Sequence, residues 1–345
     1  MGTVSLCMIV RDEEALLGRC LASVRDGVDE IVVVDTGSRD RTKQIAADYG
    51  ARVLDFPWRD DFSAARNFAF SQGSMDYLLW LDADDLVPER TAAALRTLAD
   101  GRADLVMLPY RAGFDGGGRC TFWYWRERLV RRTAGFCWQG AVHECIVPAG
   151  RVVRADFPVE HRPGEKPRSD RNLRILQRQL AETGTLPPRE RYYYGRELLE
   201  AGRCEEAAAQ LTLFLEGDGR PADKAEACRL LAGCQDVPER RLAVLLRGLD
   251  YGPPEPGLCC DLGRQYLEDG NPATAEFWFR TAMTRPEPPG FVREEERRFL
   301  PILWLTVCRD RLGDRAGALG WHRLALQLNP DHPAVRHNHR YFGLE

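Results

Sequence analysis

The chain has 345 residues, more than a single domain usually holds, so its length predicts two domains that each bury a core of their own. A formal net charge of −4 lacks the strongly basic balance of a polyanion-binding protein, so we expect no nucleic-acid partner. The first apolar stretch, Val4–Val10, is far shorter than the roughly 20 residues that span a bilayer, which predicts a cytoplasmic protein without a membrane span.

The first half of the sequence alternates apolar strands with amphipathic helices. Strands are expected at 4–10, 30–34, 52–56 and 77–81, with helical segments between them. This rhythm predicts right-handed crossovers and a Rossmann-like α/β fold with a mostly parallel sheet. Ligands of such sheets bind beyond the carboxyl ends of the strands. Because Asp35 and Asp82–Asp85 follow two of these strands, we expect both acidic sites to face one crevice.

Beyond Pro109 the pattern changes to short strands and aromatic loops. These are expected to form the acceptor side of the crevice, and at least two of the four side chains in Phe122–Trp125 are expected to be core residues. The segment Arg162–Pro167 is rich in helix breakers, and an amphipathic helix is expected to begin near Ser169. We therefore predict an α/β domain over 1–165, a linker helix over 166–188 and a second domain over 189–345.

The second half contains an internal repeat. A pattern of small residues returns after 68 residues, twice the 34-residue period of a tetratricopeptide repeat: Gly195, Gly202 and Ala207 recur as Gly263, Gly270 and Ala275. A final copy is displaced by about nine residues, which predicts an insertion near Pro286–Glu294. The pattern predicts an all-α tetratricopeptide-repeat domain that stacks helix pairs around a continuous core.

Three carboxylates are clustered at the end of the fourth predicted strand. Asp82, Asp84 and Asp85 lie within four residues, and their mutual repulsion is costly unless a cation relieves it. A few hard oxygen ligands suit Mn²⁺ or Mg²⁺ bound together with a ligand's phosphates. The alternative is a solvated turn in which Asp85 caps the next helix.

Asp35 ends the second predicted strand and is followed by Thr36-Gly37-Ser38. Its carboxylate could accept the imide N–H of a uracil or the amine of another base. The alternative is a helix start, because Ser38 or Asp40 would also cap the helix that follows. The residues alone leave both interpretations open.

Ordered motifs give the sequence a family resemblance. Those of the first half are Ser5–Glu14, Val33–Ser38, Ala65–Asn67 and Leu81–Asp84, and together they resemble the family 2 glycosyltransferases of the GT-A fold. Later motifs resemble the sublancin-type peptide S-glycosyltransferases, whose catalytic domain is followed by tetratricopeptide repeats: Gly140–Glu144, His161 and Arg171-Asn172. The resemblance covers nearly the whole chain, and four motifs in order are far more specific than any one of them.

The resemblance implies roles on the donor side of the site. It assigns Asp35 to the base, Asp82 to the ribose or sugar of the nucleotide sugar, and Asp84 to the metal. It also assigns Arg66 to the diphosphate or base, where a guanidinium offers paired donors.

The first motif departs from the family at one position. Many members have Asn where this chain has Asp12, which leaves no clear side-chain contact there. The backbone groups of Val10 and Arg11 are expected to touch the base.

On the acceptor side, the resemblance points to His143 and Glu144. Inverting transfer needs a base that deprotonates the incoming hydroxyl, thiol or amide, and Glu144 is the candidate. The alternative is a His143–Glu144 ion pair with a structural role. His161 is expected to complete the metal shell or to meet the diphosphate, although a lone histidine is as often structural.

The sequence therefore predicts a metal-dependent, inverting glycosyltransferase that uses a nucleotide-diphosphate sugar, with UDP-sugar preferred. A peptide or protein acceptor held by the repeats is the first choice. Two alternatives remain: a glycan, lipid or small-molecule acceptor with repeats that serve for docking or homodimer formation, and a non-catalytic protein that binds partners through its repeats. The intact Asp35, Arg66, Asp82 and Asp84 argue against the last.

Overall fold

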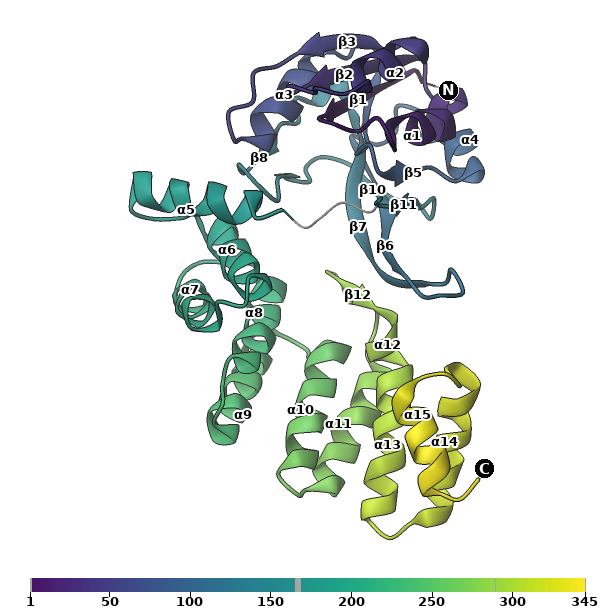
Figure 1. Cartoon of the computed structure of the whole chain (residues 1–345), viewed down its shortest axis with the longest axis vertical. Coiled ribbons are helices and arrows are strands. Elements are labelled where there is room, and N and C mark those ends of the chain that lie inside the picture. The colour runs from purple at the N-terminus through teal and green to yellow at the C-terminus, as the bar shows by residue number, and fades with distance from the viewer. Residues whose placement is uncertain (1, 165–168, 289, 345) are drawn as a thin grey trace. The chain divides into compact units, whose positions relative to one another are not determined.

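The computed structural model describes residues 2–164, 169–288 and 290–344. The chain forms two compact units, Met1–Thr185 and Leu186–Glu345. Figure 1 shows strands and flanking helices in the first unit and an array of helices in the second. Among the described residues, no helix is both long and apolar enough to cross a membrane.

The first unit is built on one mixed sheet with the strand order β3-β2-β1-β4-β7-β6-β11-β5, and β10 also pairs with β6. Neighbours are parallel from β3 to β4, and β6 is parallel to both β10 and β11, while β7 is antiparallel to its two neighbours. The strands are β1 (Val4–Val10), β2 (Glu30–Asp35), β3 (Arg52–Asp55), β4 (Tyr77–Trp80), β5 (Asp85–Leu86), β6 (Leu105–Phe114), β7 (Cys120–Arg131), β10 (Val152–Arg154) and β11 (Val159–His161). A separate antiparallel ribbon joins β8 (Trp138–Gln139) to β9 (Cys145–Ile146). The predicted mostly parallel α/β sheet is confirmed.

Helices cover both faces of this sheet because its central strands are apolar on both faces. On one face, Leu6 and Met8 of β1 pack with Leu21 of α1 (Leu17–Val24) and with Leu95 of α4 (Glu89–Leu98). On the other face, Cys7 packs near Phe70 of α3 (Phe62–Gln72). Two further helices are α2 (Thr42–Asp48) and α5 (Arg171–Thr183). The parallel strands β1, β2 and β4 therefore end at one edge, where the polar residues of the predicted site begin.

Two expectations for the middle of the chain need correction or comment. The side chains of Phe122–Trp125 are all half-buried, so the prediction that at least two belong to the core is wrong. They belong to a part of β7 that pairs with β6 but not with β4. The pairing of β4 with β7 covers only Leu129–Arg131. The predicted linker helix over 166–188 falls partly on 166–168, outside the described residues, and α5, within the rest of that range, is grouped with the compact unit Met1–Thr185.

The second unit consists of helix pairs that follow one another along the chain. The pairs are α6 (Pro188–Glu200) with α7 (Cys204–Glu216), α8 (Pro221–Gly233) with α9 (Pro238–Arg247), α10 (Pro256–Glu268) with α11 (Pro272–Thr284), and α13 (Phe299–Arg311) with α14 (Arg315–Leu328), followed by α15 (Pro333–Tyr341). The first and third pairs begin 68 residues apart, at Pro188 and Pro256. Between the third and fourth pairs lie β12 (Val292–Arg293) and α12 (Glu294–Arg297), where the insertion was expected.

Small residues allow the paired helices to pack closely. A Cβ atom at Gly263 of α10 would lie 2.7 Å from the ring of Phe279 on α11, and one at Gly195 of α6 would lie 2.8 Å from Leu211 on α7. Both approaches are closer than ordinary van der Waals contact, so only glycine fits at either position. The glycine pattern in the sequence therefore marks the crossing points, and the predicted all-α repeat unit is confirmed.

Candidate functional site

Asp35 lies at the carboxyl end of β2 and is almost completely buried, with 1% of its surface exposed. Its Oδ1 accepts hydrogen bonds from the backbone N–H groups of Gly37 and Ser38, both at 2.9 Å. Gly37 has φ +111°, a conformation that favours glycine. The Oδ2 atom is buried and has no hydrogen-bond partner among the described residues. A buried carboxylate oxygen without a partner is costly, so this atom has an unused capacity to accept an N–H donor.

Hydrogen bonds connect the loop after β1 to the loop after β2. The carbonyl of Val10 accepts from both the backbone N–H and the hydroxyl of Thr36, at 3.0 and 3.1 Å. Asp12 has φ +52°, and its Oδ1 accepts from the backbone N–H of Arg39 at 2.8 Å. The aspartate that departs from the family pattern therefore joins the two loops. The Val10 carbonyl is therefore already used by Thr36, while the side chain of Arg11 is 46% exposed, with its Nε 3.9 Å from Asp12 Oδ2.

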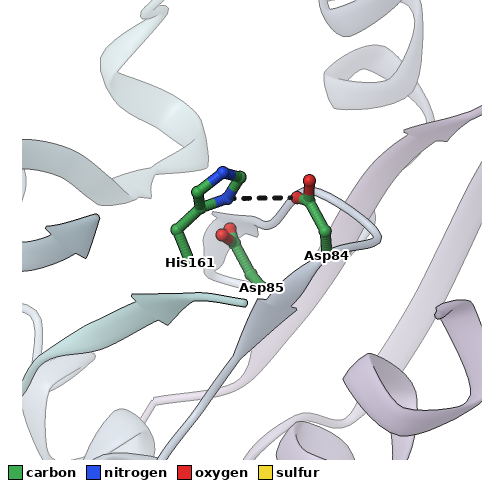
Figure 2. A group of neighbouring side chains, drawn as sticks. All are labelled: Asp84, Asp85 and His161. Atoms are coloured by element: carbon green, nitrogen blue, oxygen red, sulfur yellow. Dashed lines mark ion pairs between the residues drawn. The ribbon is translucent and has the colours of Figure 1, made fainter. Parts of the chain in front are cut away.

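The second acidic site gathers two aspartates and a histidine from separate segments. Asp84 lies in the turn after β4, Asp85 begins β5, and His161 ends β11 directly opposite Asp85 in the antiparallel register. The Oδ1 of Asp84 and the Nδ1 of His161 are 3.5 Å apart. One ligand atom from each of the three residues lies within 4.8 Å of the others. Figure 2 shows the two carboxylates and the imidazole ring turned toward one another.

Asp85 is already satisfied within the protein. Its Oδ1 accepts from the hydroxyl of Tyr110 at 2.8 Å, and its Oδ2 accepts from Arg128 at 2.9 Å and from the backbone N–H of Asp82 at 3.0 Å. The Arg128 and Asp85 side chains are both fully buried. Burial raises the pKa of Asp85 above its usual value, although Arg128 opposes the rise. Asp85 therefore fixes the turn rather than capping a helix, and Asp84 keeps the more open carboxylate.

The remaining groups fit a divalent cation. The Nδ1 atom of His161 is buried, and at 3.5 Å from Asp84 it is too far for a good hydrogen bond. Burial lowers the pKa of His161, but the Asp84 carboxylate raises it by more. The pKa of His161 therefore lies above its usual value. A carboxylate and an imidazole are ligands for Mn²⁺, and a small protein set suits a metal that also binds phosphates. The predicted metal residues, Asp84 and His161, are thus brought together.

Arg66 of α3 joins the acidic turn to the opposite side of the site. Its Nη2 donates to Asp82 Oδ1 at 2.7 Å and its Nε donates to Glu144 Oε1 at 2.6 Å. The guanidinium lies over the rings of Trp80 and Trp138, at 4.7 and 4.9 Å from their centroids. Burial would raise the pKa of Asp82, but Arg66 lowers it below the usual value. Only Nη1 of this guanidinium is left without a hydrogen-bond partner among the described residues.

The loop that carries Glu144 is held by the same helix. Asn67 and Trp138 exchange two hydrogen bonds, at 2.8 and 3.0 Å between side-chain amide and backbone. Gly140 has φ +97° and His143 has φ +50°, a conformation that is uncommon for a residue with a side chain. Glu144 is 8% exposed, and its ion pair is made with Arg66. The motif Ala65-Arg66-Asn67 therefore positions the predicted base.

A second cation adjoins this pair. Arg171, at the start of α5, lies over the ring of Phe62 at 4.5 Å. Burial lowers the pKa of Arg171, with Glu144 acting in the opposite direction and Arg11 in the same one. Arg171 is therefore influenced both by a carboxylate, Glu144, and by a second cation, Arg11.

Sequence reasoning missed the two residues that hold Asp85. Tyr110 belongs to β6 and Arg128 to β7, adjacent strands that meet side by side. The available signal was the charge of Arg128 directly before Leu129 and Val130, since a charged residue in an apolar strand needs a partner.

Comparison with known proteins identifies the first unit. Residues 5–156 match the model of glycosyl transferase family 2. The chain is 32% identical over 329 residues to the TPR repeat-containing protein Synpcc7942_0270 of Synechococcus elongatus, covering 95% of this chain and 66% of that protein. It is 27% identical over 227 residues to the SPbeta prophage-derived glycosyltransferase SunS of Bacillus subtilis, covering 59% and 51% of the two chains.

A third relative is the lipopolysaccharide core biosynthesis glycosyltransferase LpsC of Rhizobium meliloti, which is 31% identical over 163 residues and covers 44% of this chain and 60% of its own. The chain spans between half and two thirds of the length of these relatives. The family match, the mostly parallel sheet and the acidic residues at its strand ends all point to the same family. Residues 5–156 form a glycosyl transferase family 2 domain.

Proposed function

We propose that the chain is a metal-dependent, inverting glycosyltransferase that moves a sugar from a nucleotide diphosphate, preferably a UDP-sugar, to a peptide or protein. One observation carries the proposal: among the described residues, Asp35 Oδ2 at the end of β2 and His161 Nδ1, which lies 3.5 Å from Asp84 Oδ1, are buried polar atoms without a hydrogen-bond partner. Leaving such atoms unpaired is costly, and a bound ligand would satisfy them.

The nucleotide-sugar donor would be recognised both at its base and at its ribose or sugar. Asp35 Oδ2 accepts the imide N–H of the base, while its other oxygen keeps the carboxylate oriented. Asp82, with 37% of its side chain exposed, retains an oxygen for a ribose or sugar hydroxyl beyond the one that Arg66 holds. Arg11 and Arg171 supply positive charge for the diphosphate.

Asp84 and His161 would hold Mn²⁺ or Mg²⁺. When bound, such an ion neutralises the diphosphate and so stabilises the leaving group. Asp85 contributes by fixing the turn that presents Asp84, since its three hydrogen bonds leave the turn little freedom.

Glu144 would act as the base that takes a proton from the acceptor. Inversion requires the acceptor to approach opposite the diphosphate, and a base on that side raises its nucleophilicity. Arg66 orients the Glu144 carboxylate through a 2.6 Å hydrogen bond, so Arg66 is a positioning residue for the base. His143 adopts the φ +50° turn that aims Glu144, which supports a role in shaping the loop.

The resemblance to peptide S-glycosyltransferases and the helical repeats support a peptide or protein acceptor. A glycan, lipid or small-molecule acceptor is the alternative, and LpsC is a relative whose name points that way. An acceptor screen against one donor separates the two classes.

The test is a mass-spectrometric assay of donor hydrolysis and transfer with a panel of nucleotide sugars, with Mn²⁺ and with a chelator. We expect turnover of a UDP-sugar only with the metal. Glu144→Gln should lower transfer by about 10²- to 10⁴-fold while UDP binding stays unchanged. The control is Glu89→Gln, an exposed glutamate on α4. Equal rates in Glu144→Gln and wild type, or no turnover of any nucleotide sugar, would contradict the proposal.

A further inference from the structure

The second unit contains a pocket of about 360 Å³ that the proposed transfer chemistry does not use. It is formed where the end of α11, the short helix α12, the start of α13 and the end of α14 come together. The residues that give it its character are three arginines and three large apolar residues: Arg285, Arg297, Arg298, Met283, Leu324 and Leu328. Its volume falls within the range of sites that hold small ligands or single side chains of a partner.

The charged residues of the pocket lining are all arginines, and the other polar residue is the neutral Gln327. Among the described residues that line it there is no aspartate or glutamate. The Nε of Arg285 is buried and has no hydrogen-bond partner among the described residues. Arg298 is exposed, and Arg297 contacts Glu294 only at 3.5 Å. A buried guanidinium N–H without an acceptor is costly, and gathering three guanidinium groups adds repulsion, so an anion here would relieve both.

The apolar side of the pocket is unusually open to solvent. Met283 is 38% exposed, Leu324 is 42% exposed and Leu328 is 36% exposed. Single exposed apolar residues are ordinary, but three that line one concavity form a patch that gains from being covered. The pocket thus offers two kinds of contact at once, an apolar wall and a cationic rim.

We propose that this pocket binds a segment of a partner polypeptide in which an apolar side chain is flanked by aspartate or glutamate. Charge complementarity selects the occupant: arginine forks match carboxylates in two-point geometry, and the apolar wall needs an aliphatic or aromatic group next to them. A free inorganic anion would satisfy the arginines but would leave the apolar wall exposed. The proposal does not depend on the proposed glycosyl transfer.

The experiment uses the full-length chain and fluorescence anisotropy with labelled peptide pools. One pool is Ala-Ala-Asp-X-Glu-Ala-Ala with X drawn from Leu, Ile, Met and Phe; a second replaces the acids by Asn and Gln, and a third has Ser at X. We expect the first pool to bind at least about tenfold more tightly than either of the others, which corresponds to 1.4 kcal/mol.

Variants locate the binding. The double variant Arg285→Glu/Arg298→Glu should lose the preference for acidic peptide, and Leu324→Ser should lose the preference for apolar X. The control, Arg240→Glu/Arg264→Glu, makes the same change in net charge at two exposed arginines outside the pocket and should bind as wild type does. Circular dichroism melting checks that each variant is folded.

Several outcomes would overturn the proposal. Equal binding of the three pools, no binding of the first pool, or a double variant that is folded and binds like wild type would each do so. Light scattering is measured in parallel. A dimer that dissociates in the double variant would show that a second copy of the chain occupies the pocket, which also contradicts a peptide partner.

Discussion

Each unit contains a largely buried arginine that binds more than one carboxylate, and the two clusters differ in what they leave unsatisfied. In the second unit, Arg229 uses all three nitrogens: Nε donates to Asp261 at 2.6 Å, Nη1 to Glu226 at 3.1 Å and Nη2 to Glu296 at 2.6 Å. These carboxylates are only 12–24% exposed. The cluster connects the second and third helix pairs to the inserted helix α12. It is closed, and its function is structural.

In the first unit, Arg66 binds Asp82 and Glu144 but leaves Nη1 without a partner among the described residues. Asp82 is 37% exposed, and unsatisfied atoms of Asp35 and His161 also lie at the strand ends. The same residue types thus form a closed cluster in one unit and an open one in the other. The difference teaches that the Arg66 cluster keeps hydrogen-bonding capacity that a ligand could use, whereas the Arg229 cluster has used its own.

The largest effect should come from breaking the closed cluster. Arg229→Met leaves three carboxylates without their counter-charge, so we expect the unfolding free energy of the second unit to fall by about 3–5 kcal/mol. Urea denaturation followed by circular dichroism measures it. Arg264→Met, at an exposed position on α10, should change stability by less than about 0.5 kcal/mol. A similar small change in both variants would show that the Arg229 cluster does not hold the helix pairs.

Asp84 and Asp85 are neighbours with opposite expected behaviour. Asp85→Ala leaves Arg128 buried and unpaired, so the first unit should lose about 3 kcal/mol of stability. Asp84→Ala should change stability by less than about 1 kcal/mol, because its side chain is 29% exposed and the nearby His161, 3.5 Å away, is 30% exposed. Denaturation of the two variants under one set of conditions makes the comparison. Equal losses would remove the distinction between a structural and a ligand-binding aspartate.

Asp35 offers a test of base recognition. Asp35→Ala should weaken UDP binding by about 1.5–3 kcal/mol, the range for a hydrogen bond to a charged group, and should leave pyrophosphate binding unchanged. Titration calorimetry with both ligands in the presence of Mn²⁺ gives the ratio. If the two ligands lose the same affinity, the residue acts only through the turn at Gly37 and Ser38.

The smallest effect concerns pH and lies beside the closed cluster. Burial, together with the charge of Glu226, raises the pKa of Glu255 from 4.5 to about 7. Because the pKa of Glu255 is higher in the folded state, its contribution to stability is fully present below pH 4.5, where the carboxyl is protonated in both states. This contribution is lost as the pH rises toward 7 and Glu255 ionises in the folded protein. Glu255→Gln should therefore flatten the decline in thermal stability between pH 5 and about 7.5. An unchanged pH profile in the variant would assign the decline to other groups.

The sequence predicted the parts of the fold that local pattern determines. The apolar runs at β2 and β4 placed Asp35 and Asp84 at strand ends, and the glycine spacing located the helix crossings at Gly195 and Gly263. These features depend on periodicity and on single positions with no room for a side chain, which a sequence displays directly.

The remaining features depend on contacts between distant segments. The bond between Arg66 and Glu144 joins residues 78 positions apart, and the pairing of Asp85 with Arg128 spans 43. Strand register brings His161 opposite Asp85, and β5 and β11 have only two and three residues, too few for a visible alternation. Family resemblance supplied the identities of Glu144 and His161, but only the structure gives their partners.

The central claim is that the open cluster in the first unit binds a nucleotide diphosphate together with a divalent metal. Titration calorimetry of UDP into the full-length chain, with Mn²⁺ and with a chelator, tests it in wild type and in Asp84→Ala. We predict saturable UDP binding in wild type that requires Mn²⁺, and a loss of at least about 10²-fold in affinity, near 2.7 kcal/mol, in the folded variant. UDP binding of equal affinity with and without metal, or unchanged Mn²⁺-dependent binding in Asp84→Ala, would contradict the claim.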